Sequence, residues 1–103
     1  MVKVTFYNSE QGFTRVVVSG HAAFAPGGED IVCSGVSSAV MLTANAITEI
    51  LGEPADIQVL ENEVGIRLPA HSTASALAFM QALHLHLVLL QQQYPKHITV
   101  TEV

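Results

Sequence analysis

Residues 20–38 read GHAAFAPGGEDIVCSGVSS, and we expect the fold and its chemistry to be organised around them. The stretch holds the only cysteine, Cys33, and one of five histidines, His21. Between them, residues 22–30 contain Pro26, Gly27 and Gly28 and show no hydrophobic periodicity, which is typical of a mobile loop. Beyond the loop, apolar residues recur every three or four positions. The sequence therefore predicts a helix that begins at residue 31 or 32.

Two strands are predicted before this stretch. In residues 2–7, apolar positions alternate with Lys3, Thr5 and Tyr7, the period of a half-buried strand. Turn-forming residues at 8–12 lead into a valine-rich run at 13–19, so the two segments form an antiparallel hairpin. Gly20 is expected to end the pairing and leave His21 at the tip of a strand.

The first predicted helix runs to Leu51, because Gly52 and Pro54 are typical of a helix end. Asp30 is expected to cap this helix or to lie in its first turn. Apolar residues spaced by three or four should form its buried stripe. The stripe consists of Val36, Val40, Ala44, Ile47 and Leu51.

The rest of the chain predicts a second hairpin, at residues 55–60 and 64–68, then a helix over about 72–93 and a strand over 97–103. The second helix is apolar on nearly every side, so we expect sheet against one side and another subunit against the other. The order β-β-α-β-β-α-β predicts an α+β two-layer sandwich with a mostly antiparallel sheet, in a single domain of residues 1–103.

Composition limits the partners. Half of the residues are hydrophobic and only 13% are charged, which favours an oligomer. The net charge is −5, and Lys3, Arg15, Arg67 and Lys96 are scattered, so nucleic acid is not expected as a direct partner. A single cysteine cannot form an internal disulfide, and the N-terminus lacks the apolar run of a signal peptide. Polar residues interrupt residues 74–90, so no membrane span is expected, and the predicted location is the cytoplasm.

No metal or other cofactor is expected. His84 and His86 are two apart on a predicted helix, about 200° around its axis from each other, so they cannot chelate one ion. His71 and His97 have no ligand-like neighbours in the sequence.

Cys33 and His21 have the chemistry of a thiol protease pair. A helix N-terminus and a nearby imidazolium both stabilise a thiolate, and Cys33 is predicted to lie in the first turn of its helix. Unpaired amides of that turn could also bind the oxyanion formed when a peptide carbonyl is attacked. His21 would act as base and then as acid. Asp30 and Ser37 are candidate supporting residues, and residues 22–30 would cover the site as a lid that includes Ala22, Pro26, Gly27 and Gly28.

Other interpretations remain open from the residues alone. A lone cysteine on an apolar helix is more often an inert core residue, and His21 could simply be a satisfied polar residue at a strand end. The chain would then be a non-catalytic dimeric binding module. A thiol-dependent hydrolase of small acyl compounds is a third possibility.

The motifs Gly20-His21-Ala22, Gly28-Glu29-Asp30-Ile31-Val32-Cys33 and Val36-Ser37 resemble the signature of the ribosomal-processing cysteine protease (Prp) family. The similarity extends over the whole chain in length and element order, including Tyr94-Pro95. One departure is Ser34-Gly35, where paired alanines or similar small residues are expected in the family. Serine and glycine differ from alanine but are also small.

The resemblance implies a homodimeric cysteine endopeptidase. The alternative that it leaves is a non-catalytic dimeric ribosome-assembly binding module with a buried structural cysteine. The family removes a short N-terminal extension from the twenty-seventh protein of the large ribosomal subunit, cutting after two aromatic residues and before a small one. By position, His21 would be the general base and Cys33 the nucleophile, with Asp30 and Ser37 in support. The family loop moves aside for substrate, and a substrate from a basic ribosomal protein suits a chain of net negative charge.

Overall fold

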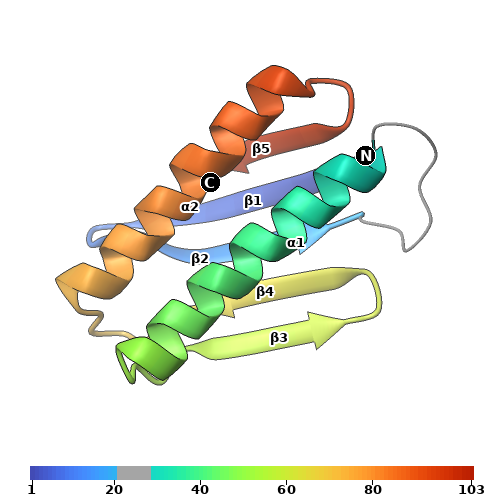
Figure 1. The fold of residues 1–103 in the computed structure, drawn as a ribbon. Helices are drawn as coiled ribbons and strands as arrows, with labels where there is room; N and C mark the ends of the chain where they lie inside the picture. Colours follow the sequence, from blue (N-terminus) through green and yellow to red (C-terminus); the bar gives the residue numbers. More distant parts are fainter. Residues whose placement is uncertain (21–28) are drawn as a thin grey trace.

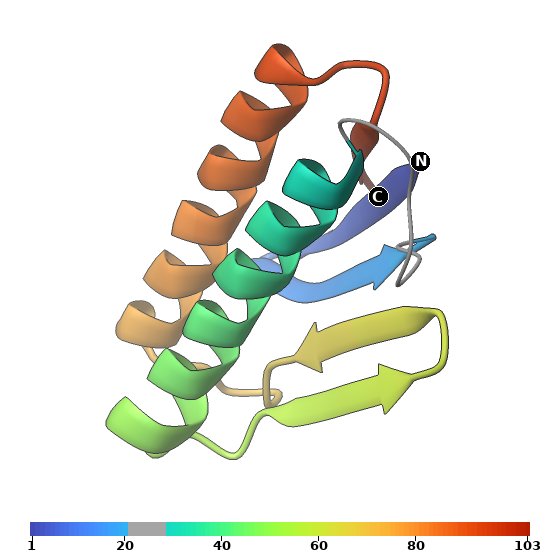
Figure 2. The ribbon, with the colours of Figure 1, turned by 45° about the vertical axis from the view of Figure 1, so that its right-hand side comes forward.

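The computed structural model describes residues 1–20 and 29–103, which form a five-stranded sheet with two helices on one face (Figures 1 and 2). The predicted element order is confirmed. The strands are β1 (Val2–Ser9), β2 (Gly12–Ser19), β3 (Asp56–Leu60), β4 (Glu63–Arg67) and β5 (Ile98–Glu102). The helices are α1 (Glu29–Asn45), which continues into the π-helical turn η1 (Ala46–Ile50), and α2 (Ala74–Gln93).

The strands lie in the order β3-β4-β2-β1-β5, and only the β1–β5 pair is parallel. The sheet is therefore mostly antiparallel, as predicted. Because side chains alternate between faces, the register assigns each residue to the helix side or to the open side. One helix-side row crosses four strands as Ile57, Ile66, Val16 and Phe6.

The core lies between the helices and the sheet. Valines and Phe6 of β1 and β2, Ile66 of β4 and Ile98 of β5 supply the sheet side. Val32, Val36 and Val40 come from α1, while α2 contributes Ala76, Met80, Leu83 and Leu87. The 3.6-residue period of these positions explains why both segments form helices against the sheet.

The buried stripe of the first helix was predicted one residue too far. Val36, Val40 and Ile47 are buried and Ala44 is half-buried, but Leu51 is 36% exposed. The amide of Leu51 bonds to the carbonyl of Ala46, five residues earlier, at 2.9 Å. A π-helical turn holds more residues than an α-helical turn, so it rotates Leu51 out of the stripe.

The helix α2 begins two residues later than predicted, because Thr73 caps it. The Thr73 hydroxyl accepts from the amide of Ala76 at 3.1 Å, and the Thr73 amide donates to Glu53 at 3.0 Å. One side of α2 is buried against the sheet as expected. The other side leaves Leu85 58% and Leu89 47% exposed in the single chain.

By length and composition alone, Ile31–Ile50 and Ala74–Gln93 are each apolar enough to cross a membrane. This result differs from the prediction for the second helix, which considered only residues 74–90 and their polar interruptions. It is weak evidence for a span, because core helices of soluble proteins pass the same test. Here both helices pack one face against the sheet.

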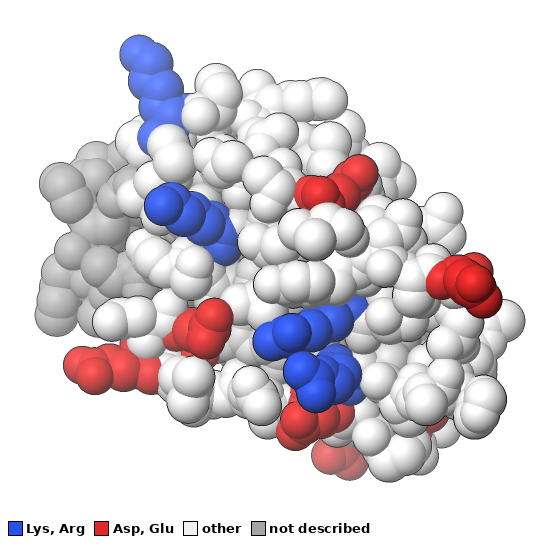
Figure 3. Space-filling model, turned by 180° about the vertical axis from the view of Figure 1, so that it is seen from behind, with Lys and Arg blue, Asp and Glu red and all other residues white. Residues whose placement is uncertain are grey.

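The opposite face of the sheet is mixed in charge, and neither of the described helices covers it (Figure 3). Register places Asp56, Arg67, Arg15 and Tyr7 in one row across it. The guanidinium of Arg15 lies over the Tyr7 ring, 4.8 Å from its centroid. The two arginines are direct cross-strand neighbours, so this face is the more basic side of an acidic protein.

Candidate active site

Cys33 lies near the start of α1, half-buried against the core. The helix begins at Glu29, which makes Cys33 its fifth residue and places it in the second turn. The prediction that Cys33 lies in the first turn was therefore wrong, because the helix begins two residues earlier than residue 31, the earlier of the two predicted starts. Acidic residues are favourable in a first turn, which explains why Glu29 and Asp30 extend the helix backwards. The first-turn amides, which have no acceptor within the helix, lie within about one turn of Cys33 along the axis.

The end of β2 lies at the same end of the fold as the start of α1 (Figures 1 and 2). Gly20 follows the strand with φ of +78°, as a residue that ends the pairing should. A β-carbon on Gly20 would lie 2.5 Å from the carbonyl oxygen of Met1, and the Gly20 amide donates to Asn62 at 3.3 Å. This steric role of Gly20 was not predicted from the sequence. The signal that could have indicated it is the position of a glycine directly before the candidate base.

Several predicted site residues lie outside the described residues, namely His21 and the loop residues Ala22, Pro26, Gly27 and Gly28. Asp30 is the second residue of α1, in agreement with a first-turn position. Ser37 is half-buried, one turn after Cys33. Because residues four apart lie on one side of a helix, Cys33 and Ser37 share a flank of α1.

The two helices approach closely near Cys33. Gly35 would place a β-carbon 3.7 Å from a methyl group of Leu90 on α2, which is ordinary contact. On the outer surface, a groove of about 530 Å³ separates the helices. Small α1 residues, Gly35, Ser38 and Ala39, form one wall, and α2 supplies Phe79 and His86 among others.

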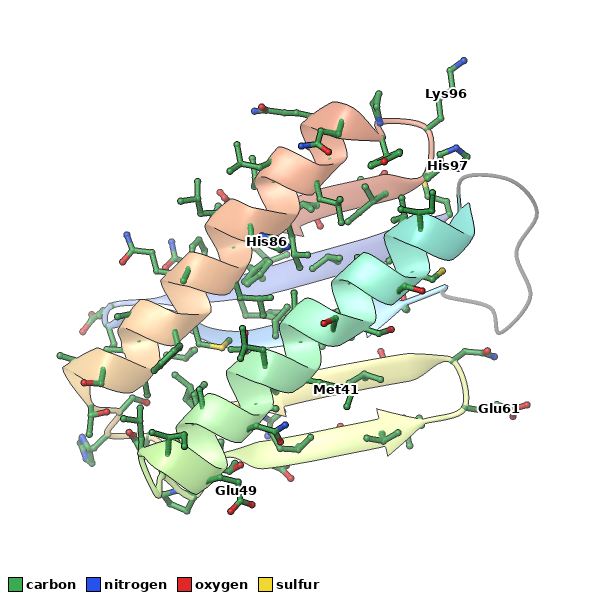
Figure 4. The ribbon with its side chains drawn as sticks, viewed as in Figure 1. Met41, Glu49, Glu61, His86, Lys96 and His97 are labelled. Carbon is green, nitrogen blue, oxygen red and sulfur yellow. The ribbon has the colours of Figure 1, made fainter. Side chains whose placement is uncertain are left out.

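The histidines of α2 lie on different sides of the helix. His84 packs under the helix, 4.9 Å from the Phe6 ring and 4.5 Å from the Phe13 ring. Its Nε2 contacts the Glu102 carboxylate, though without hydrogen-bond geometry. His86 is exposed on the outer surface (Figure 4). Within the described part of the chain, no three histidine, cysteine or acidic side chains gather as a metal site.

Comparison with known proteins gives one consistent result. A family model described as cysteine protease Prp matches residues 1–99. A curated relative, the ribosomal processing cysteine protease Prp of Staphylococcus aureus, is 30% identical over 93 residues, which are 88% of each chain.

Solved structures are similar over the full length. The essential ribosomal processing protease Prp from S. aureus, crystallised with a substrate peptide, has a TM-score of 0.92 at 25% identity, with 100% of both chains covered. The same protein with a covalently linked product peptide has a TM-score of 0.88 at 26% identity, again over 100% of both chains.

Proposed function

Because this chain belongs to the cysteine protease Prp family, we propose that it removes the N-terminal extension of the twenty-seventh protein of the large ribosomal subunit, with Cys33 as nucleophile and His21 as general base. The chain is a cysteine protease, and Cys33 is its only cysteine. That cysteine, half-buried beside the first turn of α1 and at the end of the fold where Gly20 leads into His21, is the observation that carries the proposal.

The proposed reaction has two steps. The Cys33 thiolate attacks the peptide carbonyl carbon, and amides of the first turn of α1 stabilise the oxyanion. The C–N bond then breaks, and the His21 imidazolium gives its proton to the leaving amine. A thioester now joins Cys33 to the N-terminal part of the substrate, and the C-terminal part leaves with its new amino group. His21 next takes a proton from water, whose oxygen attacks the thioester carbonyl. The C–S bond then breaks, the Cys33 thiolate is regenerated, and the N-terminal fragment leaves with its new carboxyl group.

The S. aureus relative supports this chemistry, since its product peptide is covalently linked. Asp30 and Ser37 are assigned supporting roles, because one lies in the first turn of α1 and the other one turn after Cys33. The loop of Ala22, Pro26, Gly27 and Gly28 is proposed to cover the bound peptide. A non-catalytic binding module is not favoured, because the family is named for its protease activity.

We also propose a cytoplasmic homodimer. Exposed leucines on both helices support the dimer: Leu42, which lines the groove between α1 and α2, is 69% exposed, and on α2 Leu85 is 58% and Leu89 47% exposed. Large apolar side chains gathered on one face are typical of a subunit interface. The cytoplasmic location follows from the proposed substrate, which is assembled into ribosomes there.

Peptide cleavage tests the function. A synthetic peptide that carries the ribosomal extension and its aromatic pair is incubated with wild type, Cys33→Ala, His21→Ala and, as a matched neighbour, Ser34→Ala. Mass spectrometry should show one cut after the aromatic pair with wild type and Ser34→Ala. Cys33→Ala should be inactive, and His21→Ala should be at least about a hundredfold slower. Intact peptide with wild type, or equal cleavage by Cys33→Ala, would refute the proposal.

A further inference from the structure

The two helices do not cover the whole sheet, and β3 lies partly outside the helix layer. In the helix-side row, Ile66, Val16 and Phe6 are fully buried, but Ile57 at the β3 end is 37% exposed. In the next helix-side row Val59 is 73% exposed, since most of β3 lies beyond the edge of α1 (Figures 1 and 2). Met41, 63% exposed, extends from α1 toward the β3–β4 hairpin (Figure 4). We call Met41, Ile57 and Val59 the β3 shelf.

The two edges of the sheet differ. At the β5 edge, the Val100 amide donates to the side chain of Gln91 on α2 at 2.5 Å. At the β3 edge, no described residue outside β4 bonds to the backbone of residues 57–60. The β3–β4 turn has two residues, so Leu60 and Glu63 exchange both backbone bonds. Along an antiparallel strand, residues that bond to one neighbouring strand alternate with residues that face the other way. The N–H and C=O groups of Ile57 and Val59 therefore point away from β4, toward the open edge.

The shelf is continuous with the candidate active site. Cys33, Ser37 and Met41 are four residues apart, so they form a row along one side of α1, drifting about 40° and rising about 6 Å per step. The opposite side of α1 faces α2, where Gly35 and Ala39 line the groove between the helices. At the far end of β3, the turn carbonyl of Asn62 accepts from Gly20, the residue before His21.

Two carboxylates lie beside the ends of the shelf. Of the acidic residues between 45 and 66, Asp56 and Glu63 lie in open-face rows, where Asp56 is the register partner of Arg67, and Glu53 accepts from Thr73. Glu49 and Glu61 remain for the shelf. Glu49 and Glu61 lie near opposite ends of β3 (Figure 4). From the open side, acidic side chains border the molecule where this hairpin lies (Figure 3). This surface has an open strand edge, apolar side chains beside it and a carboxylate near each end. It matches an extended segment with alternating apolar residues and flanking lysines or arginines.

We propose that the β3 edge binds the substrate polypeptide as an added antiparallel or parallel strand, with its apolar side chains on the β3 shelf, while the adjoining segment reaches Cys33. This inference rests on the proposed function. It assigns specificity to residues outside the reacting pair: Met41, Ile57 and Val59 select apolar side chains, and Glu49 and Glu61 select basic ones. Affinity for a long substrate then comes largely from the edge, and a short peptide that spans only the cut does not use it.

Two neighbouring residues of β3 make a matched test. Val59→Lys places a cation on the shelf, whereas Gln58→Lys makes the same change on the open face of the same strand. Both side chains are exposed, so neither change should alter folding, which a thermal melt checks. Each variant is assayed on the full-length ribosomal protein with its extension and on an eight-residue peptide spanning the cut. Val59→Lys should raise KM for the full-length substrate at least tenfold, with kcat and short-peptide cleavage unchanged. Gln58→Lys should change neither KM by more than twofold.

Binding separates this inference from the proposed function. Each lysine substitution is combined with Cys33→Ala, and binding of the fluorescein-labelled full-length substrate is followed by anisotropy. If Val59→Lys weakens binding tenfold and Gln58→Lys does not, the edge site is supported, even when wild type cuts neither substrate. Failure of wild type to cut would reject only the proposed function. Equal binding or equal KM for the two variants overturns the edge site. The edge site is also overturned if sedimentation shows that Val59→Lys dissociates a dimer, because a second copy of the chain would then cover the shelf.

Discussion

Gly20 approaches the first residue of the chain so closely that a β-carbon on it would lie 2.5 Å from the carbonyl oxygen of Met1. No real β-carbon contact is that short, and the obstacle is backbone, which cannot rotate away. The φ of +78° adds a second penalty for any other residue. Gly20 therefore fixes how the chain leaves β2, directly before the proposed base.

Gly20→Ala should lower the free energy of unfolding by about 3 kcal/mol, the combined cost of a left-handed alanine and a backbone clash. Gly52→Ala is the matched control, since Gly52 has φ of +68°, but among the described residues no atom beyond its chain neighbours lies within 4 Å of the place where a β-carbon would be. It should lose only about 1 kcal/mol. Urea unfolding measures both, and equal losses would mean that the Met1 contact does not constrain Gly20.

Gly35→Ala should have the opposite effect. The new methyl group would lie 3.7 Å from Leu90, an ordinary contact, and alanine is favoured over glycine in a helix interior by about 1 kcal/mol. We expect a gain of about 0.5–1 kcal/mol in urea unfolding. A loss of stability would indicate that the helices are packed more tightly at Gly35 than this contact distance implies.

The sequence predicted the order of the five strands and the two α-helices, because hydrophobic period and turn residues are local signals. The exposure of Leu51 was missed because the π-helical turn at Ala46–Ile50 breaks the 3.6-residue spacing that defined the stripe. The exposed shelf was missed for a different reason. Ile57 and Val59 have the alternation of core residues, and only the order of strands reveals that β3 is an edge.

The candidate site was predictable in part. Cys33 does lie near a helix start and Gly20 does end β2, both from local signals. The two-residue shift in the start of α1 was not predictable, because Glu29 and Asp30 suit either a loop or a first turn. The roles of His21 and Cys33 came from the motif, since local physics fits an inert cysteine equally well.

The homodimer proposal predicts that a charge on the outer helix face separates the subunits. Leu42→Lys and Leu89→Lys each place a cation at an exposed position: in the single chain Leu42 is 69% exposed and Leu89 is 47% exposed. Analytical ultracentrifugation should show a dimer for wild type and at least tenfold weaker association for both variants. Gln58→Lys, on the open face of the sheet, should remain dimeric. Unchanged dimers in all three variants would locate the interface elsewhere.

The most direct test of the central claim is to alkylate Cys33 with iodoacetamide while following cleavage of the extension peptide. Mass spectrometry counts the modified fraction unambiguously, because the chain has one cysteine. We predict that activity falls in proportion to that fraction and that the alkylation rate rises with a midpoint well below pH ~8.5, the value for an ordinary thiol. A fully alkylated protein that still cleaves the peptide would contradict the assignment of Cys33 as nucleophile.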